Sequence, residues 1–453
     1  MSEEDEKKIK SPHEQRNDRV KEHVAHLIKN VSFHGLSYVA DKRNNYFRRA
    51  IWFLITVGAF IYAVEKVYES TVNYFSYPFK TARMKIYVNE LNFPAVSFCN
   101  LNDFLFSKLN GTKLDESILY PDDPEKNNVS EIEISNITSD ATIRLDQMLV
   151  DCEFEGKKCT HENFTDFWTM QGELCFTFNS GKNSHSLLKV SGVGVLRSLK
   201  LTINVQHYEY YRDEMAGGIH LMIHGQDEEP VKMQGQIVSP GYSFYVKVEK
   251  KTIMNLEKPY KTECGTVKLK YFDRYSMHTC WLEQLTDYVN KMCHCKDFFM
   301  PGNIPYCSLP ELQNCTWIEW AKFNKDKMYK CPLPCKIDLY GVSLSRALFP
   351  TTQYSSILAE QFRKQPHVLS IVHNITDELL FMRDNLLRFI IYYDDLSYEV
   401  LEQKPSYETL VWLGDIGGQI GLFIGAGVMS YFEFLDCLAI VIYTRFFQKF
   451  TSS

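Results

Sequence analysis

Residues 413–427 read LGDIGGQIGLFIGAG, and they open a long apolar run whose core, Ile416–Tyr443, contains only two charged residues. This run is long enough to cross a bilayer, which takes about 20 residues. Gly417, Gly421 and Gly425 are four apart. That spacing predicts one helical face, on which neighbouring helices approach closely or backbone carbonyls face a lumen. A glycine stripe alone would favour simple helix packing.

Carboxylates in the same run favour a pore. Asp415 lies near its start, and Glu433 and Asp436 lie three apart toward its end. Ionisable side chains at membrane depth face water rather than lipid, because a charge in hydrocarbon is costly. Acidic rings contributed by several subunits would attract cations. We therefore expect this run to line a cation pathway.

A second candidate span lies near the N-terminus. Ala50–Val64 carries no charge and follows a basic flank of the kind that stays in the cytoplasm, formed by Lys42, Arg43, Arg48 and Arg49. The segment begins too far into the chain for a cleaved signal peptide. Two spans place both termini on one side of the membrane. We expect a cytoplasmic tail over 1–47, transmembrane helices over 48–72 and 411–444, an extracellular domain over 73–410 and a cytoplasmic end over 445–453.

Two further features place the middle of the chain outside the cell. Asn-X-Ser/Thr glycosylation acceptors occur there at Asn110, Asn128, Asn136, Asn163, Asn314 and Asn374. All of the 13 cysteines except Cys437 also lie there. An even number of cysteines in an oxidising compartment predicts a disulfide framework, although spacing leaves many pairings open.

The middle segment is expected to be β-rich. Residues 84–88, 93–99, 199–205, 218–224 and 242–251 alternate apolar with polar residues or cluster β-branched and aromatic ones. Residues 386–393 predict a strand that returns the chain to the membrane, and helices are most plausible over 144–149, 276–292 and 355–364. A net charge of −6 argues against a nucleic-acid partner.

Three motifs carry a family resemblance: Phe33-His34-Gly35, the stretch FPAVSFCN at 93–100, and residues 413–427. With them the chain resembles the degenerin/epithelial sodium channel family, in its acid-sensing-like branch. It is most like the peptide-gated (RFamide-gated) sodium channel subunits of cnidarians. The resemblance implies an α+β membrane protein in the plasma membrane, with a disulfide-stapled ectodomain of palm, finger and thumb type. It also implies a trimer around one pore, which passes sodium and is blocked by amiloride.

The resemblance assigns roles to residues of the pore. His34-Gly35 matches the family's cytoplasmic gating dipeptide, and Gly414 matches a small-residue position where bulk holds such channels open. Gly425-Ala426-Gly427 occupies the Gly-X-Ser selectivity filter, with Gly427 in place of the serine. This departure could widen the constriction and admit calcium, unless sister subunits keep the serine. The remaining residues expected at the pore or gate are Asp415, Gly418, Gly421, Glu433 and Asp436.

For the ectodomain, the resemblance implies six disulfides: Cys99–Cys175, Cys152–Cys159, Cys264–Cys335, Cys280–Cys331, Cys293–Cys315 and Cys295–Cys307. One family bridge is missing, since Gln284 and Tyr329 stand near where its cysteines would fall. Tyr74 and Tyr260 are candidates for an aromatic contact that couples thumb movement to the pore, although an interfacial aromatic belt would explain them equally well. A Cys-His-Cys run at 293–295 suits a closed zinc site poorly, and we expect no metal and no cofactor.

The sequence indicates less clearly which stimulus opens the expected channel. Trp317 and Ala321 stand where the acid-sensing branch carries pocket acids, which leaves Glu319. This pattern favours an amidated neuropeptide as ligand, with proton gating as the alternative. A two-span ATP-gated channel would need a cluster of Lys and Arg for the triphosphate, and a non-conducting receptor would leave the carboxylates at membrane depth unexplained. The sequence contains no P-loop, HExxH or GxSxG motif, and we expect no enzyme.

Overall fold

The computed structural model describes residues 34–41, 43–119, 123, 129–169, 173–182, 186–211, 215–226, 228, 235–362 and 377–446. The chain forms two compact units. The helical unit combines Met1–Lys80 with Lys404–Ser453, and the disulfide-bonded unit is Thr81–Gln403. Of the predicted cytoplasmic tail over 1–47, residues 1–33 and 42 lie outside the described residues.

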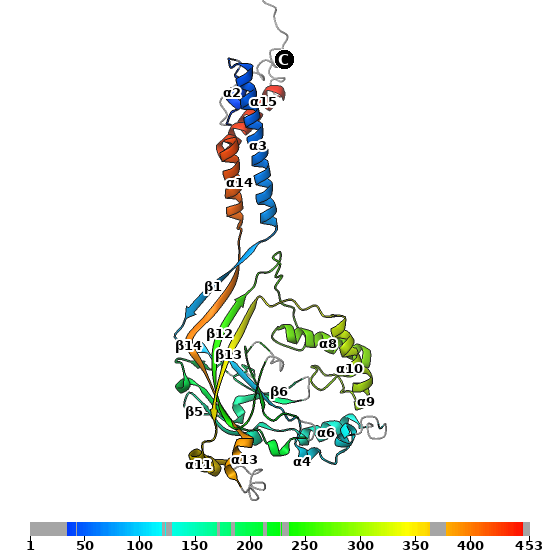
Figure 1. Ribbon diagram of the computed structural model, residues 1–453. Coiled ribbons are helices and arrows are strands. Elements are labelled where there is room, and N and C mark those ends of the chain that lie inside the picture. The colour runs from blue at the N-terminus through cyan, green and yellow to red at the C-terminus, as the bar shows by residue number, and fades with distance from the viewer. Residues whose placement is uncertain are drawn as a thin grey trace, which may run out of the picture. The chain divides into compact units, whose positions relative to one another are not determined.

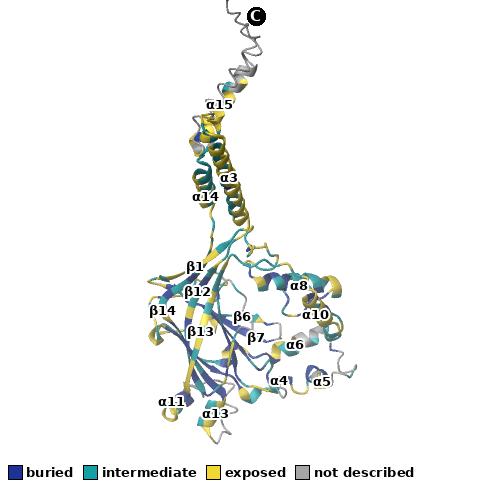
Figure 2. Ribbon diagram, turned by 45° about the horizontal axis from the view of Figure 1, so that its top comes forward, coloured by how far each residue is buried: buried dark blue, intermediate teal, exposed yellow. Residues whose placement is uncertain are grey.

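The helical unit contains α2 (Leu36–Ala40), α3 (Tyr46–Phe75), α14 (Thr409–Ile424) and α15 (Val428–Phe446) (Figure 1). In α3, 30 residues long, Ala63 is the one buried residue, so its apolar side chains are exposed along its length (Figure 2). It is long and apolar enough to cross a membrane. An exposed apolar helix of this kind suits lipid or neighbouring helices better than water.

The second apolar run is not one continuous helix. It breaks between α14 and α15. Only together are Thr409–Ile424 and Met429–Ile440 long and apolar enough to cross a membrane, and the two helices are bent by 70° relative to each other. Gly425 ends α14 in the left-handed region with φ 77°, and its N–H donates to the Gly421 carbonyl. Glycine adopts this conformation without steric cost, which makes it a common helix terminator. The prediction that Gly425 shares a helical face with Gly417 and Gly421 is therefore wrong.

The disulfide-bonded unit is built on β-sheets, as expected from the sequence. A seven-stranded sheet runs in the order β13-β12-β14-β9-β4-β5, with β1 paired to β14. β12 and β14 are parallel, whereas β12–β13 and β14–β9 are antiparallel. The strands are β1 (Phe79–Tyr87), β4 (Leu149–Phe154), β5 (Lys157–Lys158), β9 (Leu199–Asn204), β12 (Tyr242–Met254), β13 (Lys336–Leu348) and β14 (Leu386–Pro405).

A second sheet packs against the first. Its order is β11-β10-β3-β7-β6, and a short β2–β8 pair lies apart from it. The main core contains Phe98, Ile219 and Leu221 from this sheet together with Leu201 and Phe389 from the larger one, and buried residues concentrate on the strands (Figure 2). The bounds are β2 (Leu91–Asn92), β3 (Ala95–Asn100), β6 (Phe164–Trp168), β7 (Leu174–Phe178), β8 (Lys189–Val190), β10 (Ile219–His224) and β11 (Gln236–Val238).

Helices surround these sheets. The predicted helix over 276–292 is confirmed as α8, which begins where the Ser276 side chain accepts a hydrogen bond from the Thr279 N–H at 3.0 Å. We call α8 and α10 the thumb helices. The described helices of this unit are α4 (Phe106–Leu109), α5 (Lys113–Leu119), α6 (Glu131–Ala141), α7 (Leu145–Met148), α8 (Met277–Cys293), α9 (Leu309–Glu311), a π-helical turn (Leu312–Thr316), α10 (Trp317–Lys325), α11 (Thr352–Phe362) and α13 (Glu378–Asn385), with 3-10 turns at His161–Asn163, Val195–Arg197 and His207–Glu209.

Six disulfides staple the unit, and they join the pairs that the family resemblance implies. Cys99–Cys175 links β3 to β7, and Cys152–Cys159 closes the β4–β5 hairpin. The other four lie on and around the thumb helices, where they enclose sequence separations of 12 to 71 residues. Each such link restricts the unfolded chain and is worth roughly 2–4 kcal/mol.

An amide replaces the missing family bridge. Gln284 of α8 accepts the Lys330 N–H at 3.0 Å through its Oε1, and its Nε2 donates to the Lys330 carbonyl at 3.3 Å. One side chain thus ties α8 to the residue directly after Tyr329. The thumb is cross-linked here by two hydrogen bonds in place of a covalent bond.

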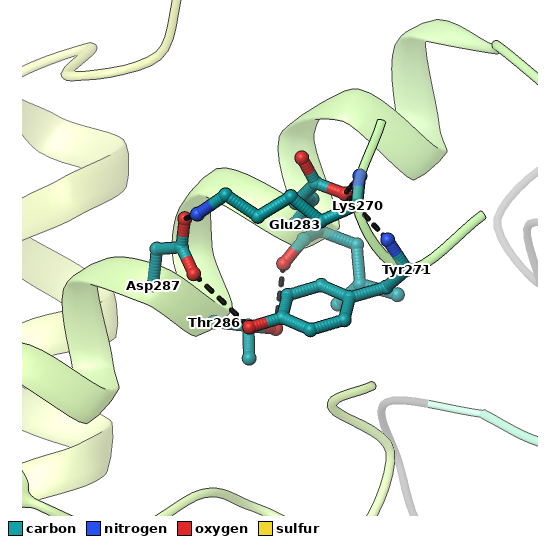
Figure 3. Close-up of polar contacts among 6 residues, drawn as sticks. Lys270, Tyr271, Glu283, Thr286 and Asp287 are labelled. Carbon is teal, nitrogen blue, oxygen red and sulfur yellow. Dashed lines mark hydrogen bonds and ion pairs between the residues drawn. The ribbon is translucent and has the colours of Figure 1, made fainter. Parts of the chain in front are cut away.

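A carboxylate cluster anchors the segment before α8 to that helix (Figure 3). Glu283, only 7% exposed, accepts the backbone N–H groups of Lys270 and Tyr271 at 2.6 and 3.0 Å. Asp287, one turn later, pairs with the Lys270 ammonium and accepts the Tyr271 hydroxyl at 3.2 Å. Thr286 donates to the Leu282 carbonyl within the helix. The segment and α8 therefore form one rigid element.

We expect Glu283→Ala to lower the free energy of unfolding of the disulfide-bonded unit by about 2–4 kcal/mol, because two N–H donors lose a charged acceptor. Thermal unfolding of the purified full-length chain, followed by tryptophan fluorescence, measures the effect. Glu283→Gln keeps an oxygen acceptor and should lose less. Lys291→Ala, at an exposed position of the same helix, should stay within about 0.5 kcal/mol of the parent chain. An unchanged midpoint in Glu283→Ala would contradict this account.

Candidate functional site

The helical unit brings together two motifs from opposite ends of the sequence. The His34 backbone N–H donates to the Ile424 carbonyl at 2.9 Å. Ile424 is the last residue of α14, and the final carbonyls of a helix have no partner inside it. The His34-Gly35 turn therefore caps the end of α14 directly beside Gly425.

The turn is also fitted closely against α3. Gly35 has φ 82°, and a Cβ built there would lie 2.5 Å from the Thr56 hydroxyl oxygen. Further along the segment, Tyr38 stacks on Trp52 with ring centroids 4.7 Å apart, and the Arg49 guanidinium donates to the Val39 carbonyl at 2.9 Å. Only glycine satisfies both the backbone angle and the space at position 35.

Residues 425–427 form the break between α14 and α15 and lie outside both helices. Gly427 donates its N–H to the Ser430 hydroxyl at 3.3 Å, and Ser430 returns its own N–H to the Gly427 carbonyl at 3.1 Å. A Cβ built at Gly427 meets nothing within 4 Å. The position therefore has room for a larger side chain within one subunit.

The predicted pore carboxylates lie on both helices of the broken run. Asp415 in α14 accepts a hydrogen bond from the Tyr407 hydroxyl, which lies 2.7 Å from the Ser70 hydroxyl of α3. Glu433 and Asp436 are exposed on α15, about one turn apart. Gly414 and Gly418 are exposed on α14, whereas Gly421 is half-buried, and built Cβ atoms at all three meet nothing within 4 Å.

An aromatic contact joins the far ends of α3 and α14. Tyr74 stacks on Trp412 with centroids 4.6 Å apart and an interplanar angle of 12°. The Trp412 indole N–H donates to the Thr71 hydroxyl at 3.4 Å, and the Tyr74 and Thr409 hydroxyl oxygens are 3.0 Å apart. Sequence reasoning missed Trp412 and Thr409. Their three-residue spacing on one face of a predicted helix was the available signal.

Tyr260 belongs to the disulfide-bonded unit, in the turn after β12, where its N–H donates to the Glu257 carbonyl at 3.1 Å. Its coupling to Tyr74 stays a prediction. Among the glycosylation acceptors, Asn110, Asn136, Asn163 and Asn314 are exposed, as a glycan requires. Asn128 and Asn374 lie outside the described residues.

Two carboxyls of the thumb differ in their readiness to take up a proton. Glu319 accepts hydrogen bonds from the Lys322 ammonium and the Tyr288 hydroxyl, both at 2.7 Å, and the Lys322 ammonium above all holds the pKa of this carboxyl below its usual range. Asp297 is only 5% exposed, and burial raises its pKa to about 6 although the Phe298 N–H donates to it. Sequence reasoning missed Asp297, because nothing in the local pattern showed that this loop carboxyl is buried.

Comparisons with known proteins give consistent results. A family model described as amiloride-sensitive sodium channel matches residues 27–437. The chain is 30% identical over 447 residues to acid-sensing ion channel 1C of Danio rerio, with 90% of this chain and 82% of that protein covered. It is 28% identical to acid-sensing ion channel 1 of Gallus gallus (89% and 81% covered) and 29% identical to acid-sensing ion channel 2 of Homo sapiens (89% and 84% covered).

Proposed function

Because the chain belongs to the amiloride-sensitive sodium channel family, we propose that it is a pore-forming subunit of a plasma-membrane cation channel opened by an extracellular amidated peptide. The channel passes sodium and is blocked by amiloride, and three subunits, identical or sister chains, surround one pore. Its relatives are ion channels, and the chain is not an enzyme. The disulfide-bonded unit is the extracellular domain.

The proposed topology has two spans. α3 forms the first span, and α14 with α15 forms the second, bent at residues 425–427. The basic residues before Ala50 support a cytoplasmic N-terminus. With an even number of spans the C-terminus lies on the same side. In this arrangement Asp415 stands at the outer end of the second span, and Glu433 and Asp436 stand toward its inner end.

The hydrogen bond between His34 and Ile424 is the observation that carries the pore proposal. Non-helical backbone at membrane depth is tolerated only where it is buried in protein or lines a water-filled cavity. The break at residues 425–427 is such a backbone, and the His34-Gly35 turn satisfies the helix end beside it. A constriction built from backbone and supported from the cytoplasmic side fits a selectivity filter with an attached gating element.

Peptide opening is supported by the state of the thumb carboxyl that sequence reasoning singled out. Glu319 is ionised at neutral and mildly acidic pH, because Lys322 and Tyr288 stabilise its charge. This carboxyl therefore takes up no proton in that pH range. A cationic peptide, in contrast, is attracted by the net charge of −6 on the chain. Ligand binding opens the pore only if the ligand binds the open state more tightly than the closed one.

Acid opening is the second candidate, and two observations favour it. The relatives above are named acid-sensing ion channels. Asp297, with a pKa of about 6, changes charge between neutral and mildly acidic pH. A carboxyl of this kind in the thumb could report acidification where Glu319 could not.

The function is tested by whole-cell recording from cells that express this chain alone and then with candidate sister subunits. Amidated peptides and steps from pH 7.4 to 5.5 are applied in turn. Peptide-evoked, amiloride-sensitive sodium current supports the proposal, and current evoked by acid alone selects the second candidate. Gly414→Val has room within the subunit and should give constitutive current. Silence of all combinations, with this variant at the cell surface, would refute a pore-forming role.

Gly35→Ala should weaken the contact between the N-terminal turn and α14. Alanine at φ 82° costs about 1–2 kcal/mol, and its Cβ would also collide with Thr56. A free-energy change of this size in the gating equilibrium changes the evoked current by about tenfold. We therefore expect Gly35→Ala to lower the evoked current at unchanged surface expression. Gly58→Ala is the matched control, since it lies in α3 with nothing within 4 Å of a built Cβ. Equal currents from both variants would argue against a gating role for the turn.

Gly427→Ser restores the family's filter residue at a position that has space for it. A ring of serine side chains narrows the constriction and adds hydroxyl groups around it. We expect the permeability ratio of sodium over calcium to rise by several fold, measured from reversal potentials under bi-ionic conditions. Gly58→Ser, in α3 with nothing within 4 Å of a built Cβ, serves as control. An unchanged ratio would show that Gly427 does not set selectivity in this chain.

A further inference from the structure

A pocket of about 440 Å³ lies in the disulfide-bonded unit, apart from the pore elements. Its walls come from α6, from β6 and from the segment between the thumb helices, which lie close together in both ribbon views (Figures 1 and 2). Pockets that hold small ligands are commonly about 300–1,000 Å³, with apolar walls and a few polar groups. Thr138, Asp166, Trp168, Lys296, Asp297 and Phe298 are among the lining residues.

Aromatic and aliphatic side chains line the pocket together with polar and charged ones. Trp168 of β6 meets Phe298 edge to face, with ring centroids 5.9 Å apart, and it lies opposite Leu174 in the β6–β7 register. Trp168 keeps 39% of its surface exposed. Residues two apart on a strand share a face, so Asp166 and Trp168 both point to the pocket side of β6. A carboxylate and an indole ring therefore stand side by side.

Among the described residues, the charged side chains that line the pocket do not pair with Asp166. The Lys296 ammonium donates to the Gly302 carbonyl at 2.6 Å and lies 4.7 Å from the centroid of the Tyr306 ring. Arg144 pairs with Asp146 at 3.5 Å. Within the described ranges no basic side chain lies within ion-pair distance of Asp166, which is exposed.

We propose that this pocket binds the cationic and aromatic end of the opening ligand, with the cation between the Asp166 carboxylate and the Trp168 ring. Carboxylates attract cations by charge, and an indole face attracts them through its quadrupole. The aromatic body of the ligand packs against Phe298. An arginine followed by an aromatic amide at the end of a peptide has this chemistry, as does a small aromatic guanidine. The assignment rests on the proposed ligand gating, and it names the site on this chain.

Occupation of the pocket would connect two parts of the ectodomain. Trp168 belongs to the five-stranded sheet, and Asp297 and Phe298 follow α8 and its disulfide-bonded end. A ligand held between them crosslinks the sheet to the thumb. This gives the ligand a way to bind one arrangement of the thumb more tightly than another, as gating requires.

The test uses the full-length chain, with sister subunits where current requires them, on intact cells. A fluorescent tetrapeptide amide ending in Arg-Phe-NH₂ and phenethylguanidine are the two probes, and binding and current are recorded separately. Asp166→Asn and Trp168→Ala should each weaken probe binding at least tenfold at equal surface expression. Glu162→Gln, an exposed acid just before β6 and outside the pocket, should stay within twofold.

A double-mutant cycle locates the cation. Replacing the peptide's arginine by citrulline should weaken binding to the parent chain at least tenfold but cause little further loss in Asp166→Asn, because the two changes remove one interaction. Additive losses would place the cation elsewhere and overturn the proposal. Parent-like binding in both Asp166→Asn and Trp168→Ala would also overturn it, even if the peptide opens the channel.

Acidity gives a second readout. The charged and titratable groups around Asp297 are Lys296 beside it, Asp166 and Arg144 across the pocket, and the Tyr306 hydroxyl. Burial raises the pKa of Asp297 to about 6, so a change from pH 7.5 to 5.5 removes a negative charge. Peptide affinity should fall at least threefold, and this fall should vanish in Asp297→Asn. Persistence of the pH effect in that variant would contradict the assignment.

The probes also separate this inference from the proposed function. Binding that depends on Asp166, without peptide-evoked current, would leave the site standing and refute peptide gating. Binding of phenethylguanidine alone, lost in both variants, would assign the pocket to a small aromatic cation. Absence of binding by either probe would overturn the site.

Discussion

The hydrogen bond from the His34 N–H to the Ile424 carbonyl joins the N-terminal segment to the end of α14. A helix that stops inside a bilayer leaves carbonyls that neither lipid nor the helix can satisfy. In this chain Gly425 turns the backbone away in a left-handed conformation, and the His34-Gly35 turn supplies a donor. The close fit of Gly35 against Thr56 in α3 holds that donor in place. The two apolar segments and residues 34–41 thus form one element around the break at residues 425–427.

Covalent and hydrogen-bonded links stiffen the disulfide-bonded unit. Four disulfides and the Gln284–Lys330 hydrogen bonds cross-link the thumb, and Glu283 binds the preceding segment to α8. In the large sheet, β1 follows α3, β14 precedes α14, and the two strands pair with each other. Arg83 and Lys85 of β1 add ion pairs to Glu399 and Asp395 of β14. Since exposed ion pairs contribute little by themselves, the backbone ladder is the main connection between these strands.

The sequence predicted what depends on local pattern. The apolar run near the N-terminus predicted helix α3, alternation predicted the β-rich core, and periodicity predicted α8. Helix α6 was missed, because EISNITSDA offers little apolar periodicity, although its Ser130–Glu133 capping box marks its start. The break at Gly425 was missed because glycines four apart also fit a packing face. Contacts such as Tyr74–Trp412 and His34–Ile424 join residues hundreds of positions apart, and the six disulfide pairs came from family resemblance, since spacing alone leaves the pairing open.

The two proposed stimuli, peptide and acid, make opposite demands on the charge of Asp297. A cationic ligand in the pocket beside β6 is helped by the negative charge of Asp297, whereas an acid sensor acts by losing that charge. Glu319 does not change its charge in this pH range, because the Lys322 ammonium holds the pKa of its carboxyl below the usual range. Protonation of Asp297 near pH 6 would therefore weaken the binding of a cationic ligand. It would also remove the desolvation penalty of a buried carboxylate in the thumb. If ligand binding and protonation both act through this segment, protonation of Asp297 lowers the affinity for the peptide, and acid and peptide are not independent agonists.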